Sequence, residues 1–238
     1  MPFPWRLIRG ALAWLAAASL CLSACGGGTI HVAGPAQRPI LGLTAEEQQL
    51  FDQAQAAMNG AGCAAVKTAS PYAPAEMDRS HIGGGDLPVP PPLSAYASRP
   101  PASGPHEPSP LASGVYLAPP SVYRTIHSLE HAAAIVWVDP SVVDSHPPNK
   151  DFVELADFFS RSDEGDHVIV APYFYVDQGT AGRLPQGISM ALVAWHRIQL
   201  CKRVSLPVAF AFVTAYRFDP EAPTRYQGEA PETGVPIG

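Results

Sequence analysis

The sequence predicts a small α+β domain with a few strands, two or three helices and a long irregular arm rich in proline. Apolar residues recur at helical spacing in several segments, and short uncharged apolar runs are typical of buried strands. The 27 prolines among 238 residues also require long stretches of extended loop. We expect a single domain over residues 44–232, followed by a tail at residues 233–238.

A helix is predicted at the start of the domain. Residues 44–47 read Thr-Ala-Glu-Glu, the form of a capping box, in which the Thr44 hydroxyl and the Glu47 carboxylate satisfy free backbone amides. Apolar residues follow at helical spacing, and the glycines at 60 and 62 favour a stop. The sequence therefore predicts a helix over residues 45–58.

The prolines are concentrated in residues 64–120. Eleven of them lie between Pro88 and Pro120, a density that excludes a continuous helix and disfavours a central strand. The stretch is either a disordered linker or a long loop fastened to the core by aromatic residues such as Tyr96 and Tyr116.

Regular structure resumes at Ser121, which is suited to cap a short helix. The apolar positions Val122, Ile126, Leu129 and Ala133 then follow at steps of four, three and four. The remaining predicted elements are a buried strand at 134–138, an amphipathic helix at 151–160, a strand at 168–175, a strand within 188–200 and a helix at 206–216.

The first residues are typical of an export signal. Arg6 and Arg9 precede an uncharged apolar run at residues 11–22, which is short for a membrane span. The run ends in Leu-Ser-Ala-Cys25, which resembles a bacterial lipobox. The resemblance implies removal of residues 1–24 and attachment of fatty acyl chains, such as palmitate, to Cys25. Residues 25–43 then form a flexible tether.

These features predict a lipid-anchored protein of the cell envelope, on the extracytoplasmic side of a bacterial membrane. Removal of Arg6 and Arg9 leaves 13 basic and 21 acidic residues, a net charge of −8. An acidic chain without a basic run is a poor candidate for binding nucleic acid.

Two cysteines, Cys63 and Cys201, remain in the mature chain beside Cys25. In an exported protein, such a pair is most simply a disulfide. A metal site with two thiolates is the alternative, and an oxidising compartment disfavours it.

The densest group of ligand-type residues is His127-Ser128-Leu129-Glu130-His131. On a helix, His127 and His131 lie one turn apart on the same side, as a shared metal ion requires, whereas on a strand they lie about 13 Å apart. With His81 or His106 added, the set suits zinc or copper. The sequence thus predicts a binding protein whose cluster holds a transition metal or organises a pocket for a small ligand.

Three alternatives compete with a metal site. The first is a buried polar network in which Glu130 and the histidines bond to the backbone of the arm. The second is a zinc hydrolase, because His-x-x-Glu-His is the inverted zincin pattern with Glu130 as general base; its third, acidic ligand would be Glu154. The third is a purely structural envelope protein.

Several segments together resemble one bacterial family, the domain of unknown function numbered 3105. The resemblance covers roughly residues 63–232 and implies a fold and a set of histidines but no reaction. Ala132 departs from it, since glycine is expected there. The segments are residues 80–82 (Ser-His-Ile), 100–106 (Pro-Pro-Ala-Ser-Gly-Pro-His), 114–116 (Gly-Val-Tyr), 127–131, 191–195 and 230–232 (Ala-Pro-Glu).

Lipidation at Cys25 is directly testable. Labelling of host cells with a fatty-acid analogue is expected to mark the wild-type protein and to miss Cys25→Ser, because the thiol is the acceptor of the acyl chain. Equal labelling of both proteins would contradict the assignment.

Overall fold

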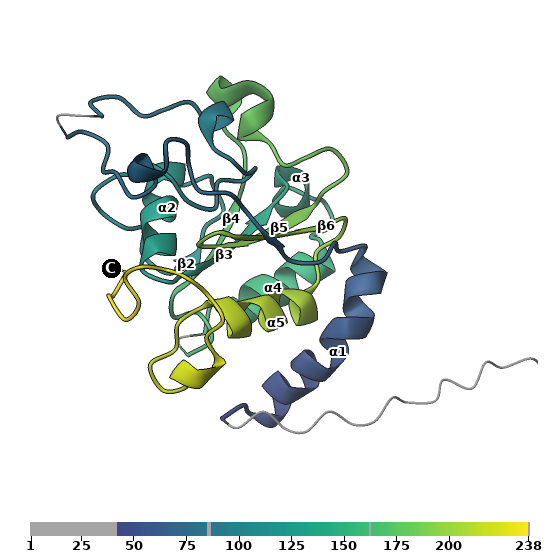
Figure 1. Cartoon of the computed structure of the whole chain (residues 1–238). Coiled ribbons are helices and arrows are strands. Elements are labelled where there is room, and N and C mark those ends of the chain that lie inside the picture. Colours follow the sequence, from purple (N-terminus) through teal and green to yellow (C-terminus); the bar gives the residue numbers. More distant parts are fainter. Residues whose placement is uncertain (1–41, 85–86, 162, 238) are drawn as a thin grey trace, which may run out of the picture. The chain divides into compact units, whose positions relative to one another are not determined.

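A mixed sheet of six strands forms the centre of the described part of the chain, which in this computed structural model comprises residues 42–84, 87–161 and 163–237 (Figure 1). The predicted α+β class is confirmed. Strands β2, β4 and β3 run parallel, and the hairpin β5–β6 and strand β1 continue the sheet antiparallel. In sheet order the strands are β1 (Lys67–Thr68), β6 (Arg197–Cys201), β5 (Met190–Ala194), β3 (Ala134–Val138), β4 (Val168–Pro172) and β2 (Gly114–Val115).

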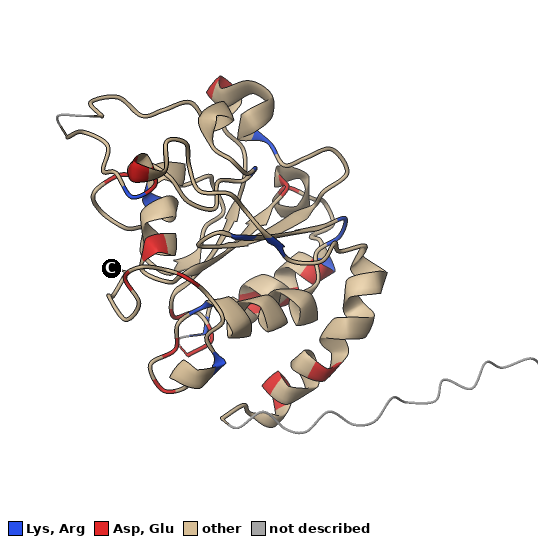
Figure 2. Cartoon of the chain, in the orientation of Figure 1, with Lys and Arg blue, Asp and Glu red and all other residues tan. Residues whose placement is uncertain are grey.

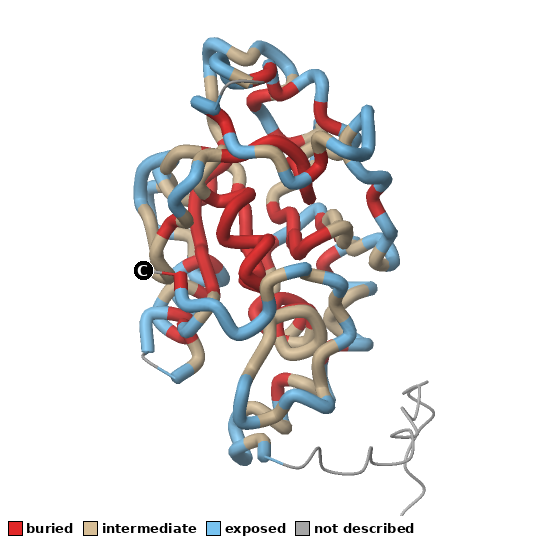
Figure 3. The backbone as a smooth tube through the Cα atoms, turned by 60° about the vertical axis from the view of Figure 1, so that its left-hand side comes forward, coloured by how far each residue is buried: buried red, intermediate tan, exposed pale blue. Residues whose placement is uncertain are grey.

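The two faces of the sheet are covered differently. On one face pack helices α1 (Ala45–Ala61), α4 (Lys150–Phe159) and α5 (Leu206–Tyr216), and on the other lie α2 (Val122–Glu130) and the proline-rich arm (Figure 1). Side chains of β3 alternate between the faces: Val136 joins the helix-covered face, and Trp137 joins the arm face. The sheet is therefore buried on both sides (Figure 3). The shorter elements are α3 (Pro140–Val143) and the 3-10 turns η1 (Ala75–Met77), η2 (Leu93–Ala95), η3 (Val176–Gly182) and η4 (Pro223–Arg225).

The first helix has the predicted start and a later end. Thr44 and Glu47 form the capping box. The predicted end at residue 58 was wrong by three residues, because Gly60 stays helical. Gly62, in the left-handed conformation at φ 62°, then ends the helix.

The segment 188–200 holds two strands instead of one. Ala194 pairs with Arg197, so Trp195 and His196 form a two-residue turn, with His196 at φ 54°. The alternation predicted for β5 is confirmed, since Met190 and its neighbours two and four residues on face the helices. Other boundaries differ as well: β4 ends at Pro172, and α4 begins and ends one residue earlier than predicted, with Asn149 as its N-cap.

The proline-rich arm at residues 64–120 packs onto the domain. Leu93 and Tyr96 are 3% and 7% exposed, so this stretch is a fastened loop and not a linker. Its only strands, among the described residues, are β1 and β2, and each occupies an edge of the sheet. A proline-rich chain, which has few amide donors, is tolerated at the edge of a sheet because an edge strand pairs on one side only.

Charged residues lie mainly at helix ends and in loops, whereas β3, β4 and β5 carry none (Figure 2). Among the described residues, no helix combines the length and the apolarity that crossing a membrane requires. The expected signal peptide, Cys25 and most of the tether lie outside the described residues.

The predicted disulfide between Cys63 and Cys201 is present. It joins Cys63, two residues after the end of α1, to the last residue of β6, across a sequence separation of 138 residues. Cys201 is fully buried on the helix-covered face, so the bond fixes α1 against the sheet.

Replacing Cys63 by Ser is expected to lower the free energy of unfolding by about 2–5 kcal/mol, because the unfolded chain regains the freedom of a long loop. Chemical denaturation measures the change. The double replacement with Cys201→Ser controls for the buried free thiol, and two free thiols in the native protein would contradict the bond.

Candidate functional site

Helix α2 places His127 and His131 one turn apart, as the metal hypothesis requires. The hydroxyl of Ser121 caps the helix by accepting from the Arg124 amide, and His131 is the C-cap, its amide bonded to the carbonyl of His127. The two Nε2 atoms are 3.1 Å apart. Both side chains are buried, at 5% and 6% exposure.

The turn after His131 carries backbone strain. Ala132 has φ 65°, in the left-handed region where a side chain is disfavoured and glycine is not. Alanine in place of the glycine expected here therefore costs conformational energy, but the turn still forms. This buried turn leads directly into β3.

Two segments of the arm bring His81 and His106 to the helix. They form a parallel bridge, in which the His106 amide donates to the Ser80 carbonyl and the Ile82 amide donates to the His106 carbonyl. Gly104 allows this approach: it has φ 122°, and a Cβ there would lie 2.7 Å from the Tyr96 ring. The backbone of the arm thus stacks the His81 ring on that of His127, with centroids 5.1 Å apart.

Backbone carbonyls fix the tautomers of three of these imidazoles. Nδ1 lies 2.8 Å from the Gly104 carbonyl in His106, 2.6 Å from the Glu107 carbonyl in His127 and 3.2 Å from the Pro236 carbonyl in His131. A carbonyl only accepts, so each Nδ1 carries the proton. In the neutral rings, every Nε2 then presents a lone pair to the interior of the cluster.

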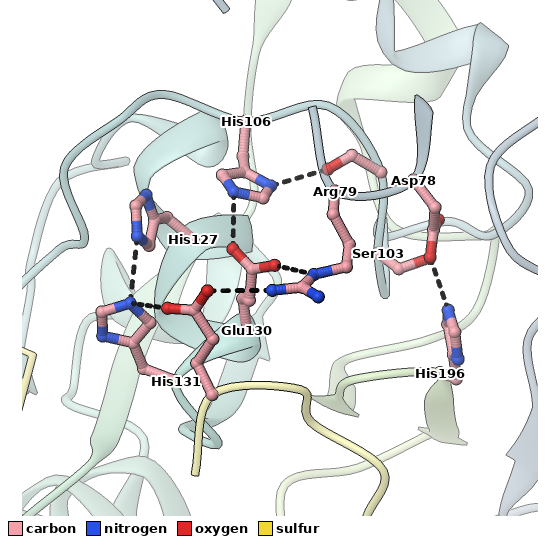
Figure 4. A network of polar contacts seen from close by, with 10 residues as sticks. Asp78, Arg79, Ser103, His106, His127, Glu130, His131 and His196 are labelled. Carbon is pink, nitrogen blue, oxygen red and sulfur yellow. Dashed lines mark hydrogen bonds and ion pairs between the residues drawn. The ribbon is translucent and has the colours of Figure 1, made fainter. Parts of the chain in front are cut away.

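The carboxylate of Glu130 lies in the same interior (Figure 4). Its Oε1 is 2.5 Å from Nε of Arg79, and its Oε2 is 3.0 Å from Nε2 of His106. Burial raises the pKa of this carboxyl, but the contacts with His106 and Arg79 outweigh burial and hold the pKa at about 2. Glu130 is therefore ionised at neutral pH although it is 2% exposed.

The contact between His106 and Glu130 is not a regular hydrogen bond. His106 is fully buried, and its Nε2 has no hydrogen-bond partner of suitable geometry among the described residues. The contact is an ion pair only when the ring carries a second proton. In the neutral tautomer, a lone pair and a carboxylate oxygen face each other, and a buried acceptor pair of this kind calls for a cation.

Ligand-type atoms of His81, His106, His127 and Glu130 all lie within 4.8 Å of one another. His81 is the exposed member and the other three are buried. His131 joins this group through His127. The structure thus brings together all four histidines that the sequence singled out, and it adds Glu130 as a candidate ligand.

Glu232 is a site residue that the sequence analysis quoted only within a family segment. Its Oε2 lies 3.3 Å from Nε2 of His131, and its Oε1 lies 2.9 Å from Arg79. Its amide donates to the Glu130 carbonyl. The C-terminal segment therefore lies against the cluster, and Ile237 beyond it is buried in the core. The separation of 101 residues from His131 gives no local signal for this contact.

Glu154, the acidic ligand expected for an inverted zincin, is remote from the cluster. It is an exposed residue of α4, which packs on the helix-covered face, whereas α2 packs on the arm face. Glu154 therefore cannot share an ion with His127. Glu130, with Oε1 held by Arg79 and a pKa of about 2, is also poorly suited to act as a general base.

A second polar group, missed from the sequence, fastens the arm beside the cluster. Asp78 accepts from the Tyr72 amide at 2.6 Å, from the Ser103 hydroxyl at 2.7 Å and from His196 Nε2 at 2.8 Å. Figure 4 shows the contact with His196. His196 comes from the turn of the β5–β6 hairpin, so Asp78 links both arm segments to the sheet. Neither residue lies in a local motif.

The family model described as a protein of unknown function, DUF3105, matches residues 93–233, more than half of the chain. No curated protein and no solved structure matches the chain. The matched range includes His106, His127, Glu130, His131 and Glu232, and His81 lies before it.

Replacing Asp78 by Asn is expected to lower the free energy of unfolding by about 1–3 kcal/mol at neutral pH, because one buried and two partly buried donors lose a charged acceptor. Burial raises the pKa of Asp78, but the hydrogen bonds from His196, Ser103 and Tyr72 lower it below 3.8 overall. The advantage of the wild type is therefore full above pH 3.8 and shrinks as the pH falls further, through the lowered pKa.

Denaturation curves of both proteins across this acid range measure the effect, with exposed Asp144→Asn as the matched control. A stability difference between wild type and Asp78→Asn that stays constant below pH 3.8 would contradict this account of the charge.

Proposed function

The chain belongs to the DUF3105 family, whose description assigns no reaction, and we propose from its site that it is a lipid-anchored extracytoplasmic protein that binds a transition metal. One observation carries the proposal. His106, His127 and His131 each donate Nδ1–H outward to a backbone carbonyl, so their Nε2 lone pairs point into the cluster, where they face one another, the buried carboxylate of Glu130 and the partly exposed carboxylate of Glu232. Metal-ligating histidines are held in this way in known metal sites.

Among the described residues, these lone pairs face other acceptors. Between His127 and His131, two Nε2 atoms face each other at 3.1 Å, and neither carries a proton in the neutral tautomers. Burial lowers the pKa of His127, which outweighs the opposing effect of its bond to Glu107 and favours the neutral, ligating form. A bound cation converts this repulsive arrangement of acceptors into a stable one.

The spacing and the donor types favour zinc or copper. Two nitrogens bound to one zinc ion at about 2.0–2.1 Å in a tetrahedral geometry lie about 3.3 Å apart. The 3.1 Å between His127 and His131, and the 3.3 Å from His131 to Glu232, are close to this value. A set of imidazoles with a carboxylate suits zinc and copper better than magnesium or calcium.

The N-terminal sequence supports the proposed anchor. Its basic residues, apolar run and Cys25 have the form of a lipoprotein signal, and the disulfide between Cys63 and Cys201 fits an oxidising compartment. We place the domain on the extracytoplasmic side of the membrane, held by acyl chains on Cys25.

The alternatives account for less of the geometry. A purely structural network explains the outward bonds to carbonyls but leaves the inner lone pairs facing acceptors. A hydrolase of the inverted zincin type needs Glu154 as its acidic ligand, and Glu154 lies on the opposite face of the sheet from the cluster. Metal binding uses the outer bonds and the inner lone pairs together.

Replacing His127 by Ala is expected to abolish the tightest zinc or copper binding, because the ring is central to the cluster. Calorimetric titration of the metal-free protein measures it. His146→Ala is the matched control, since His146 is exposed and contacts only the nearby Asp144 carbonyl among the described residues. His196 is unsuitable as a control because it holds Asp78. Absence of a saturable site at neutral pH in the wild type would refute the proposal.

A further inference from the structure

We infer that the cluster holds two metal ions at adjacent positions, an inference that rests on the proposed function. The first position is formed by His127, His131 and Glu232. The second is formed by His106, Glu130 and the exposed His81.

The short contacts between acceptors separate into these two sets. His131 Nε2 lies 3.1 Å from His127 Nε2 and 3.3 Å from Glu232 Oε2, whereas His106 Nε2 lies 3.0 Å from Glu130 Oε2. Each Nε2 has a single lone pair and so binds a single ion. His127, already paired with His131 at the separation expected for a shared ion, is therefore not available to the second position.

The second position has its own unsatisfied ligand. His106 is fully buried, its Nδ1 proton is committed to the Gly104 carbonyl, and its Nε2 has no regular hydrogen bond among the described residues. An ion bound only by the first set leaves this Nε2 facing the carboxylate of Glu130. A second ion, between His106 and Glu130, satisfies both atoms.

Arg79 orients the two carboxylates in the same way. Its guanidinium holds Oε1 of Glu130 through Nε and Oε1 of Glu232 through the terminal nitrogen. In each carboxylate, the other oxygen, Oε2, is the one that faces a histidine Nε2. One arginine thus aligns one carboxylate oxygen for each ion, while its own side chain is half exposed.

His81 gives the second position access to solvent. Its ring lies beside those of His106 and His127, with centroids 5.0 and 5.1 Å away, and it is the exposed member of the cluster. An ion can therefore reach the second position from solvent past this exposed side chain. The rings of His106 and His127 are 4.8 Å apart, so the two positions are adjacent. Two adjacent divalent ions are an arrangement that binds a shared oxygen ligand.

Titration of the full-length mature protein in detergent, first stripped of metal, with zinc is the test. The wild type and the control His146→Ala are expected to bind two equivalents, counted by calorimetry and by elemental analysis after gel filtration. Glu232→Gln is expected to lose one equivalent and to keep the other. His106→Ala is expected to lose the complementary equivalent, so the double variant binds neither.

His81→Ala keeps the test informative if His106→Ala does not fold, because His81 is exposed. His81→Ala is expected to weaken zinc affinity at the second position at least tenfold and to leave the affinity at the first position unchanged. A single equivalent in the wild type overturns the two-ion inference and leaves the proposed function standing. Loss of both equivalents in Glu232→Gln also overturns it. No binding in the wild type refutes both proposals.

Discussion

The buried carboxylate of Glu130 is the constraint on which the arrangement of the arm depends. A carboxylate that is 2% exposed is costly unless charged or polar partners compensate for the lost water. Its cationic partner, Arg79, and the imidazole of His106 that it contacts both come from the proline-rich arm. The arm therefore has to return to the last turn of α2, and the same contacts bring its histidines to those of the helix.

The irregular arm is suited to positioning these histidines because most of its backbone groups are not hydrogen-bonded within a sheet or a helix. The carbonyls of Gly104 and Glu107 are free to accept from imidazoles. The bridge between His81 and His106 sets the relative position of the two arm segments. Asp78 and the buried Tyr96 fasten the loop nearby. A site built on a loop is precise only where such contacts determine the loop.

Structural and ligand-binding roles are combined in the same rings. On each of His106, His127 and His131, one nitrogen holds backbone together, and the other points to the interior. A structural network therefore uses the Nδ1 atoms of these rings, and metal binding uses their Nε2 atoms. The C-terminal segment completes the cluster, because Glu232 contacts Arg79 and His131 while Pro236 accepts from His131.

The sequence by itself determined the elements whose signals are local. Capping residues and apolar periodicity gave α1, α2 and β3, and the i to i+4 spacing of His127 and His131 required the helix on which they lie. The two remaining cysteines predicted their disulfide. Tertiary structure alone decided that 188–200 is a hairpin, that Glu154 lies on the opposite face from the cluster, and that Asp78, Arg79 and Glu232 belong to the polar groups. The contacts of Arg79 with Glu130 and Glu232 and of Asp78 with His196 join residues 51, 153 and 118 positions apart. No periodicity or local motif encodes which distant charges must pair once a carboxylate is buried.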